Sequence, residues 1–393
     1  MKCPLCETEM EKLGEFPFAD FDGSLFNCRA DLMGCSPCDF IRVAFPFSDK
    51  ELSDYYEQSE SLYTSLSGVG VGGNSTEDLA RYAHGLNIVS AIPGTGSVVD
   101  VGCSRGGFLN YVRDHTAWNV HGIEIDRNAL ASLEQTGIPA SFGSAAALPL
   151  APESQELLTY FHVLEHVNDV HGILSEMARV LATGGHVLIE VPDAQHYLDA
   201  RVGDWFWLAM KEHVNHFSAT ALCRALERHG LIPERIEQSR LPMKNNTTYP
   251  SLVVLAKKER NAEIRNRAVK ETPLGWFREY VDSETRSFER TAERLRIFCR
   301  GKNTVYFWGI GLEFLNLAAH KIILAEKEGK STDLLLIDQN KEKQKRTFRN
   351  RSIAAANSIA RDGGLVVVSY LSGDEIATAA IRSGWDQKAI FRI

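Results

Sequence analysis

The sequence lacks an excess of positive charge. Its 393 residues carry a formal net charge of −8 at pH 7, so no overall positive field exists to attract nucleic acid or an anionic membrane. No stretch approaches the roughly 20 apolar residues that a membrane-spanning helix requires. The first ten residues, MKCPLCETEM, lack the apolar core of a signal peptide. These absences predict a cytoplasmic protein that has neither nucleic acid nor a membrane as its partner.

Cysteine is scarce beyond residue 38. Five of the eight cysteines lie within the first 38 residues, and four of them form two C-x2-C pairs with 28 residues in between: Cys3, Cys6, Cys35 and Cys38. In a reducing compartment such clustering indicates metal binding rather than disulfides. Four thiolates form the tetrahedral ligand set of a structural zinc and leave no open position for catalysis. We predict a zinc-binding module over 1–48 with Cys3, Cys6, Cys35 and Cys38 as the ligands. Replacement of one of them by Cys28 is left open, and free thiols in a small apolar module are the alternative.

Segments typical of strands and helices alternate from residue 97 onward. The predicted strands are 97–102, 119–125, 138–143, 156–161 and 185–191. Helices are predicted to start near Gly106, Arg127 and Val170. This alternation predicts a parallel sheet covered by helices on both faces. A helix that begins after Ser75 or Thr76 precedes the sheet.

The rest of the chain continues this pattern. A predicted helix over 218–230 and a closing strand over 251–258 complete the first α/β unit. Residues 259–300 are charged, with apolar positions that indicate long helices bridging two domains. A second alternation of strands and helices fills 301–393. The aromatic segment DWFWLAM, residues 204–210, is predicted to fill the core, the alternative being the wall of a substrate pocket.

The segment VVDVGCSRGGFL, residues 98–109, is an apolar strand that leads through a glycine turn into a helix. In an open parallel sheet, ligands bind beyond the carboxyl ends of the strands. The dinucleotide fingerprint G-x-G-x-x-G is absent because Ser104 takes its second glycine position. Asp100 at the strand end suits a cationic ligand group, and Glu124 ends the next strand, where it can accept hydrogen bonds from ribose hydroxyls. S-adenosylmethionine (SAM) is a nucleoside with an amino-acid tail, so it offers both a cationic group for Asp100 and ribose hydroxyls for Glu124. The alternative is that Asp100 only caps the turn and that Glu124 is solvated.

Five motifs follow one another in the order and spacing of the class I SAM-dependent methyltransferases, which residues 75–258 resemble: 98–109, 120–130, 147–150, 162–170 and 179–193. The resemblance implies a Rossmann-like core. It also implies a set of cofactor-binding residues: Asp100, Gly102, Cys103 and Gly106 around the methionine end, Glu124 and Ile125 at the ribose, Ser144 and Ala145 near adenine, and Phe161 near the sulfonium. Ser144 departs from the acidic residue common at its position, which weakens the expected hydrogen bond to the adenine amine.

Two histidine-rich segments supply candidates for a general base, which a proton-bearing acceptor requires. HVLEH places His162, Glu165 and His166 just after the fourth predicted strand, and KEHVNHFS places Glu212 and His213 after the fifth. Methyl transfer itself is a direct displacement that depends mainly on alignment in a dry pocket. We predict His213, Glu212, His166 and His162 as the catalytic set; helix capping and loop pinning are the alternative for HVLEH.

The whole layout resembles the sugar C-methyltransferases, which methylate nucleotide-linked deoxy-keto-sugars. It predicts an α/β protein whose parts are a zinc module (1–48), a SAM methyltransferase domain (49–258), a helical linker (259–300) and a second, Rossmann-like α/β domain (301–393). The resemblance implies that His213 is the base acting on the carbon beside the ketone. The family's Tyr-His-Glu-His run reads here Met210 to His213, so Lys211 is left as an electrostatic substitute for the lost groups.

Other functions remain open at this point. O- or N-methylation of another small-molecule acceptor is the main alternative, because fold alone does not give the substrate. An RNA methyltransferase would require a basic face, which the net charge of −8 disfavours. A SAM-binding protein without catalytic activity is a further alternative, which the presence of Asp100, Glu124 and His213 disfavours.

Overall fold

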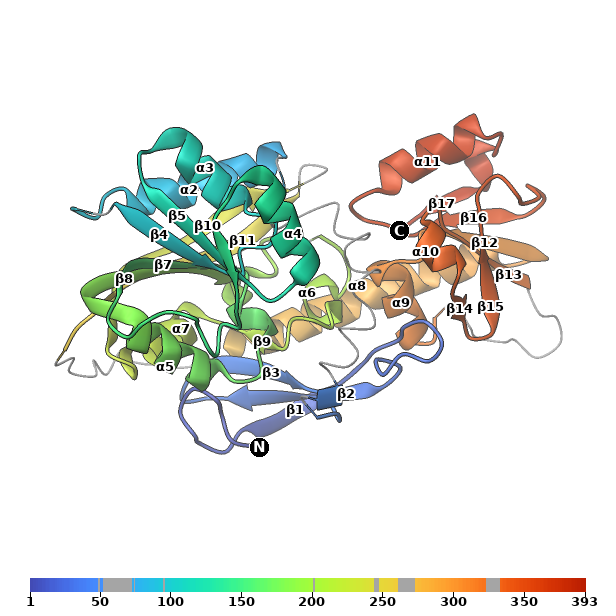
Figure 1. Cartoon of the computed structure of the whole chain (residues 1–393). Helices are drawn as coiled ribbons and strands as arrows, with labels where there is room; N and C mark the ends of the chain where they lie inside the picture. The colour runs from blue at the N-terminus through green and yellow to red at the C-terminus, as the bar shows by residue number, and fades with distance from the viewer. Residues whose placement is uncertain are drawn as a thin grey trace.

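The computed structural model describes residues 1–48, 50–51, 73, 75–94, 96–200, 202–243, 247–260, 273–322 and 333–393. Within these residues the strands form three sheets, one for each predicted globular part of the chain (Figure 1). Among the helices so described, none is long and apolar enough to cross a membrane. The predicted α/β class with additional N- and C-terminal units is confirmed.

The N-terminal sheet is antiparallel and takes its last strand from a distant part of the chain. Its order is β1 (Glu11–Pro17), β2 (Arg29–Cys35), β3 (Phe40–Ala44) and β9 (Asn215–His216). The two-residue strand β9 lies between β8 and β10 of the central sheet in sequence, yet it pairs with β3. The N-terminal module and the segment after His213 are therefore one sheet.

The central sheet has seven strands. Their order is β10 (Leu231–Pro242), β11 (Thr248–Lys258), β8 (Leu181–Pro192), β7 (Gln155–Phe161), β4 (Ser97–Val101), β5 (Asn119–Glu124) and β6 (Ala140–Phe142). Strands β4 to β8 are mutually parallel, as predicted, while β11 and β10 add an antiparallel pair at one edge. The chain passes from β4 outward to β6 and returns on the other side of β4 at β7, so the strand order reverses between β4 and β7. Ligands bind at such a reversal in open α/β sheets.

Helices cover both faces of the central sheet (Figure 1). One face carries α2 (Thr76–Val89), α3 (Gly107–His115) and α4 (Arg127–Thr136), and the other carries α5 (Val170–Val180) and α7 (Ala219–Glu227). Ser75 caps α2 through a reciprocal pair of hydrogen bonds with Asp78, as expected for a helix that begins there. Three short helices fill the connections that lead toward β9: η1 (Leu164–His166), η2 (Ala194–His196) and α6 (Phe206–Ala209).

The C-terminal unit has a six-stranded, mostly parallel sheet. Its order is β14 (Thr347–Phe348), β15 (Arg351–Ala354), β13 (Asp333–Ile337), β12 (Thr304–Trp308), β16 (Gly364–Val367) and β17 (Ile390–Arg392). Its helices are α9 (Leu312–Ala319), α10 (Lys341–Gln344), α11 (Gly373–Arg382) and η4 (Gln387–Ala389). The predicted helical linker contains one long helix, α8 (Gly275–Cys299), and residues 261–272 lie outside the described residues.

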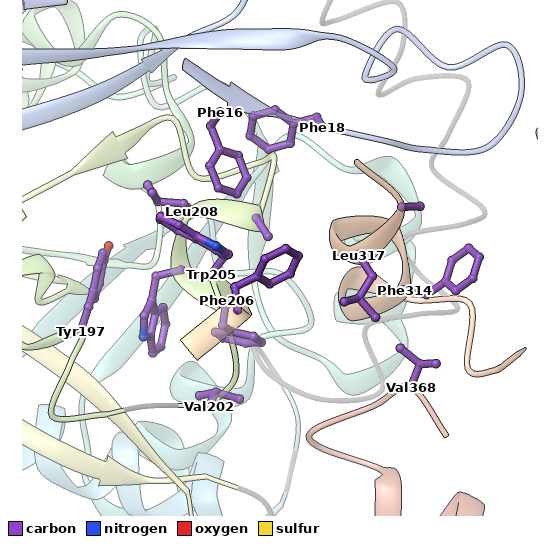
Figure 2. Close-up of a cluster of buried hydrophobic side chains, with 14 of the residues drawn as sticks. Phe16, Phe18, Tyr197, Val202, Trp205, Phe206, Leu208, Phe314, Leu317 and Val368 are labelled. Carbon is purple, nitrogen blue, oxygen red and sulfur yellow. The ribbon is translucent and has the colours of Figure 1, made fainter. Parts of the chain in front are cut away.

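One hydrophobic core joins the three units, and α8 contributes to it rather than only linking two domains. Phe16 and Phe18 from the N-terminal module meet the aromatic segment at Trp205 and Phe206, and Phe314 of α9 belongs to the same cluster (Figure 2). The aromatic segment fills the core as predicted, since all three of its rings are buried.

Buried hydrogen bonds reinforce this junction. The carboxylate of Glu284 on α8 accepts from the backbone N–H of Trp205, and the side chain of Asp204 accepts from the hydroxyl of Thr291. The amide of Asn316 on α9 donates to the carbonyl oxygen of Asp204 at 3.0 Å. Polar groups buried with their partners specify one arrangement of the packed elements.

Candidate functional site

The turn after β4 is tightly wound and depends on its glycines. Gly102 and Gly106 both have φ near +73°, in the left-handed region. A Cβ atom at Gly106 would lie 2.4 Å from a methyl carbon of Leu133, so no larger residue fits there without movement. Ser104 also adopts a left-handed conformation, with φ +48°, at the position that corresponds to the second glycine of the dinucleotide fingerprint. The turn therefore keeps the backbone of residues 102–106 close to the carboxyl ends of β4 and β5.

Glu124 ties this turn to the loop after β5. One carboxylate oxygen accepts a hydrogen bond from the N–H of Ser104 at 2.7 Å, and the other accepts from the N–H groups of Ile125 and Asp126 at 2.8 and 2.9 Å. The side chain is buried at 7% exposure. Three backbone donors stabilise the ionised carboxylate, which keeps free lone pairs for further donors.

Asp100 lies at the bottom of the same turn with no cation beside it among the described residues. It is 4% exposed and accepts a hydrogen bond from the hydroxyl of Thr159 at 2.7 Å. Burial raises the pKa of Asp100 to about 7, against the opposing effect of the Thr159 hydrogen bond and with a further rise from the charge of Glu124. A ligand that brings a positive charge to this place would favour the ionised carboxylate.

The other predicted cofactor residues differ in what they offer. The Cys103 side chain is buried in the core, against Gly122, so that position has only its backbone to present at the turn. Ile125 is 63% exposed at the carboxyl end of β5. Phe142, at the end of β6, is 49% exposed and was not among the predicted residues, although an apolar residue at a strand end is a usable signal. The Ser144 hydroxyl accepts from the N–H of Ala146 in the following loop.

The loop after β7 lies directly against the glycine turn. A Cβ atom at Gly102 would lie 2.7 Å from the side chain of Val163, and the ring of Phe161 packs on Phe108 of α3 with ring centroids 4.7 Å apart. Val163 is followed immediately by η1, which contains Glu165 and His166. The HVLEH segment therefore borders the turn, as its position after the fourth strand predicted.

The two histidine-rich segments meet each other. The rings of His166 and His213 stand edge to face with centroids 4.7 Å apart, and Nδ1 of His166 donates to the carbonyl oxygen of Glu212 at 3.1 Å. Nδ1 of His213 is buried and has no hydrogen-bond partner among the described residues. Burial, and then the neighbouring imidazoles of His166, His216 and His162, lower the pKa of His213 well below its ordinary value. His213 is therefore neutral at pH 7, and one of its ring nitrogens is buried without a partner among the described residues.

Glu212 and Lys211, which precede His213, both have other partners. Glu212 contacts His166 through its backbone carbonyl, and the pKa of His213 is lowered mainly by burial. Lys211 forms an ion pair with Asp20 of the N-terminal module and lies over the ring of Phe26. Lys211 is thus engaged with the module and does not replace the groups missing from the Tyr-His-Glu-His run.

His162 is held among carboxylates. Its Nδ1 lies 3.0 Å from Glu165 and 3.0 Å from the hydroxyl of Tyr249, and its Nε2 lies 3.7 Å from Glu190. Burial opposes protonation, but the hydrogen bond to Glu165 and the nearby carboxylate of Glu190 outweigh it, so the pKa of His162 is raised. Its backbone is left-handed at φ +58°. These contacts favour the alternative considered for HVLEH, in which His162 holds the loop in place, over proton abstraction by His162.

The four cysteines of the C-x2-C pairs come together. Their sulfur atoms lie within 4.8 Å of one another, and the N–H of Leu5 donates to Sγ of Cys3. The residue after each pair, Glu7 and Asp39, has φ of +60° and +55°, so the two pairs share one turn geometry. Cys28 lies outside this group, so it is not a substitute ligand in this arrangement. Four soft sulfur donors in this arrangement fit a tetrahedral zinc.

Comparison with known sequences decides the class of the central unit. A family described as a methyltransferase domain matches residues 76–234. Residues 76–234 are thus similar to a methyltransferase domain. Its Rossmann-like sheet, and the reversal of strand order beside the glycine turn, agree with that assignment.

Curated relatives match about a third of this chain. A ubiquinone biosynthesis O-methyltransferase from Ralstonia nicotianae is 33% identical over 128 residues, which are 30% of this chain and 53% of that protein. A demethylmenaquinone methyltransferase from Roseiflexus sp. is 30% identical over 155 residues, 37% of this chain and 62% of that protein. The chain thus spans about half the length of the first of these relatives.

Among solved structures, a SAM-dependent methyltransferase from Methanosarcina mazei aligns with a TM-score of 0.39 at 16% identity. The alignment covers 44% of this chain and 98% of that protein.

Proposed function

We propose that this protein transfers a methyl group from SAM to a small-molecule acceptor, with His213 as the general base. The observation that carries the proposal is the unpartnered, buried Nδ1 of His213, which stands beside His166 in a loop cluster that borders the glycine turn. When bound, SAM supplies the methyl group as a sulfonium. A neutral imidazole in a dry pocket can accept the proton that the acceptor loses on methylation.

SAM would be held along the carboxyl ends of β4, β5 and β6. Asp100 would face the cationic methionine end, Glu124 the ribose hydroxyls, and the exposed apolar groups of Ile125 and Phe142 would cover the adenine ring. The backbone at Gly102, Cys103 and Gly106 would approach the ligand because the turn is compact. Gly102 also abuts Val163, which connects the cofactor turn to the histidine cluster.

The acceptor that we favour is a nucleotide-linked keto-deoxysugar, methylated on carbon. His213 would remove the proton from the carbon beside the ketone, and the electron pair left there would form the new carbon–methyl bond. The docked C-terminal α/β unit supports a large acceptor with a nucleotide part, because it is packed to the segment that precedes His213. The similarity to a ubiquinone biosynthesis O-methyltransferase favours the second candidate, methylation of an oxygen, in which the same base would take a hydroxyl proton.

A product analysis separates these two chemistries. The protein is incubated with SAM carrying a ¹³C methyl group and a nucleotide-linked keto-deoxysugar, and the product is examined by NMR. A methyl carbon bonded to carbon supports the first candidate. A methoxy signal supports O-methylation, and no label transfer to this class of acceptor contradicts the sugar proposal.

We also propose that the N-terminal module holds one structural zinc through Cys3, Cys6, Cys35 and Cys38. The closeness of the four sulfur atoms and the matching turns at both pairs support this assignment. Four thiolates close the coordination sphere, so the metal would stabilise the fold and take no part in methyl transfer.

The buried carboxyl of Asp100 predicts a pH-dependent affinity for SAM. Because its pKa is raised to about 7, the group is mostly protonated at pH 6 and mostly ionised at pH 8. A cationic ligand pairs with the ionised form, so the dissociation constant of SAM should be higher at pH 6 than at pH 8, by up to about tenfold for each pH unit below the pKa. Calorimetry at both pH values measures this. Asp100→Asn should bind SAM weakly at both, and equal affinities for the unmodified protein contradict the placement of Asp100.

Glu124→Ala should weaken SAM binding by roughly 1.5–3 kcal/mol, the range for hydrogen bonds to a charged group. The loss has two sources, the ribose contacts and the bridge between the two loops that Glu124 forms through Ser104 and Ile125. Glu134→Ala, on the exposed face of α4, is the control and should leave the affinity unchanged. An unchanged SAM affinity of Glu124→Ala by calorimetry would falsify the ribose assignment.

A further inference from the structure

The N-terminal module builds part of the acceptor site. Strand β3 pairs with β9, with Ile41 opposite His216 and Arg42 opposite Asn215. The N–H of Val43 donates to the carbonyl oxygen of Val214 at 2.9 Å. The segment that follows His213 is therefore fixed as the outer strand of the module's sheet.

The same segment is hydrogen-bonded to η1 on its other side. The N–H of Val214 donates to the carbonyl oxygen of Glu165 at 2.9 Å, and the amide of Asn215 donates to the carbonyl oxygens of Leu164 and Val167 at 2.9 and 2.6 Å. Strand β9 thus lies between the module and the helical turn that carries His166. The distance between His166 and His213 depends on this three-part arrangement.

Arg42 of β3 bridges all three parts. It is 9% exposed, and its guanidinium donates to the carbonyl oxygen of Asn168 at 3.0 Å, to Oδ1 of Asn168 at 3.1 Å and to Oδ1 of Asn215 at 3.2 Å. The planar fork of the guanidinium allows one side chain to hold the η1 loop and β9 together, which a lysine could not do. Bonds from a charged donor to buried acceptors are among the stronger ones in proteins.

A second tie starts beside the cysteine cluster. The hydroxyl of Ser218 donates to the carbonyl oxygen of Asp39, the residue after Cys38, at 2.8 Å. Ser218 also caps α7 by accepting from the N–H of Ala221. Asp39 in turn accepts from the backbone N–H of Leu274 at the start of α8. The cysteine knuckle is therefore hydrogen-bonded to the residue that follows the β9 segment and to the start of α8.

We propose that Arg42 is a positioning residue that sets the His166–His213 pair, so that the folded cysteine module controls the acceptor site without controlling SAM binding. The hydrogen bonds of Asp100 and Glu124 do not involve the module: Glu124 accepts from the glycine turn and from the loop after β5, and Asp100 accepts from Thr159. This inference rests on the proposed function only for the role of His213 as the base. The geometry of the two rings can be measured whether or not that role holds.

The test follows the imidazole signals of the full-length protein by NMR with ¹³C-labelled histidine, assigned with His166→Gln and His213→Gln. Arg42→Ala should remove the ring-current shifts that His166 and His213 impose on each other at 4.7 Å. Its metal content should match that of the unmodified protein, and its SAM affinity should stay within about twofold. Added guanidinium ion at millimolar concentration should restore the signals, and ammonium should not.

Arg29→Ala is the matched control, because Arg29 lies on β2 of the same module and pairs only with exposed Glu15 among the described side chains. It should change none of these signals. Asn168→Ala lies outside the module and removes one acceptor of Arg42, so it should move both histidine signals in the same direction as Arg42→Ala. This variant tests the proposal even if Arg42→Ala loses its metal. Unchanged histidine signals in Asn168→Ala or in metal-retaining Arg42→Ala overturn the proposal, as does a parallel loss of SAM affinity.

Catalysis gives a second readout. Methyl transfer to an acceptor that the unmodified protein accepts should fall at least about tenfold in Arg42→Ala, because a displacement of about 1 Å far from the chemistry can cost 10²-fold. A normal rate in Arg42→Ala with displaced rings would contradict the proposed function of His213 and leave the positioning by Arg42 standing.

Discussion

Replacing His213 with alanine should lower the rate of methyl transfer by about 10²–10⁴-fold, the usual contribution of a general base, and leave the affinity for SAM unchanged. The imidazole lies in the histidine cluster, and the groups that bind the cofactor lie on the β4 and β5 ends, so the two functions separate. Its Nδ1 is buried and unpaired among the described residues, so no internal bond has to break before it accepts a proton.

The measurement uses deuterium exchange as well as turnover. With the keto-sugar acceptor and S-adenosylhomocysteine in deuterated water, the protein should exchange the proton on the carbon beside the ketone, and His213→Ala should not. His171→Ala, an exposed histidine on α5, serves as the control and should behave like the unmodified protein. Normal turnover by His213→Ala removes this residue from the mechanism, and exchange without His213 assigns the proton to another group.

The pH profile provides a check on the same residue. Burial and the imidazoles of His166, His216 and His162 lower the pKa of His213, while Glu165 and Glu212 are the carboxylates of the segments that meet there. Because a lowered pKa keeps the imidazole unprotonated, the rate at saturating SAM should persist as the pH falls through 6.5, the ordinary pKa of histidine. A rate that halves near pH 6.5 would indicate a solvated base instead.

The sequence predicted the parts of the fold whose signals are local. Strands β4, β5, β7 and β8 are apolar runs, and α3, α4 and α5 begin within about a residue of the predicted starts because glycine and aspartate mark those ends. Strand β10 was missed because one side of it is exposed and polar, so LIPERIEQSRLP has no continuous apolar run. Strand β9 has two residues and exists only through its pairing with β3.

The sequence predicted which residues form the candidate site better than it predicted how they are arranged. The glycine turn, Asp100 and Glu124 follow from spacing along adjacent strands, which the parallel sheet brings to one edge. The meeting of His166 with His213 depends on the β3–β9 pairing and on Arg42, contacts between residues more than 120 positions apart. The engagement of Lys211 by Asp20 is of the same kind. Periodicity and spacing carry no information about such contacts, so the ion pair of Lys211 with Asp20 could not be predicted.

Replacing Cys35 with serine should abolish metal binding and unfold the N-terminal module. Structural zinc contributes about 10–16 kcal/mol in small metal-dependent folds, comparable to the total stability of a domain at about 5–15 kcal/mol. A module of about 45 residues has too little core to compensate for that loss. Because Phe16 and Phe18 of the module belong to the shared core, its unfolding should also expose the aromatic segment around Trp205.

Metal analysis of the purified protein should give about one zinc per chain, and Cys35→Ser should give none. Limited proteolysis should then cleave Cys35→Ser within the first 45 residues, while SAM still binds to the methyltransferase domain. Cys28→Ser is the matched control: its thiol is half-buried and outside the sulfur cluster, so this variant should keep its metal and its resistance to proteolysis. A folded, protease-resistant N-terminus without metal contradicts the zinc assignment, and loss of metal in Cys28→Ser would return that thiol to the ligand set.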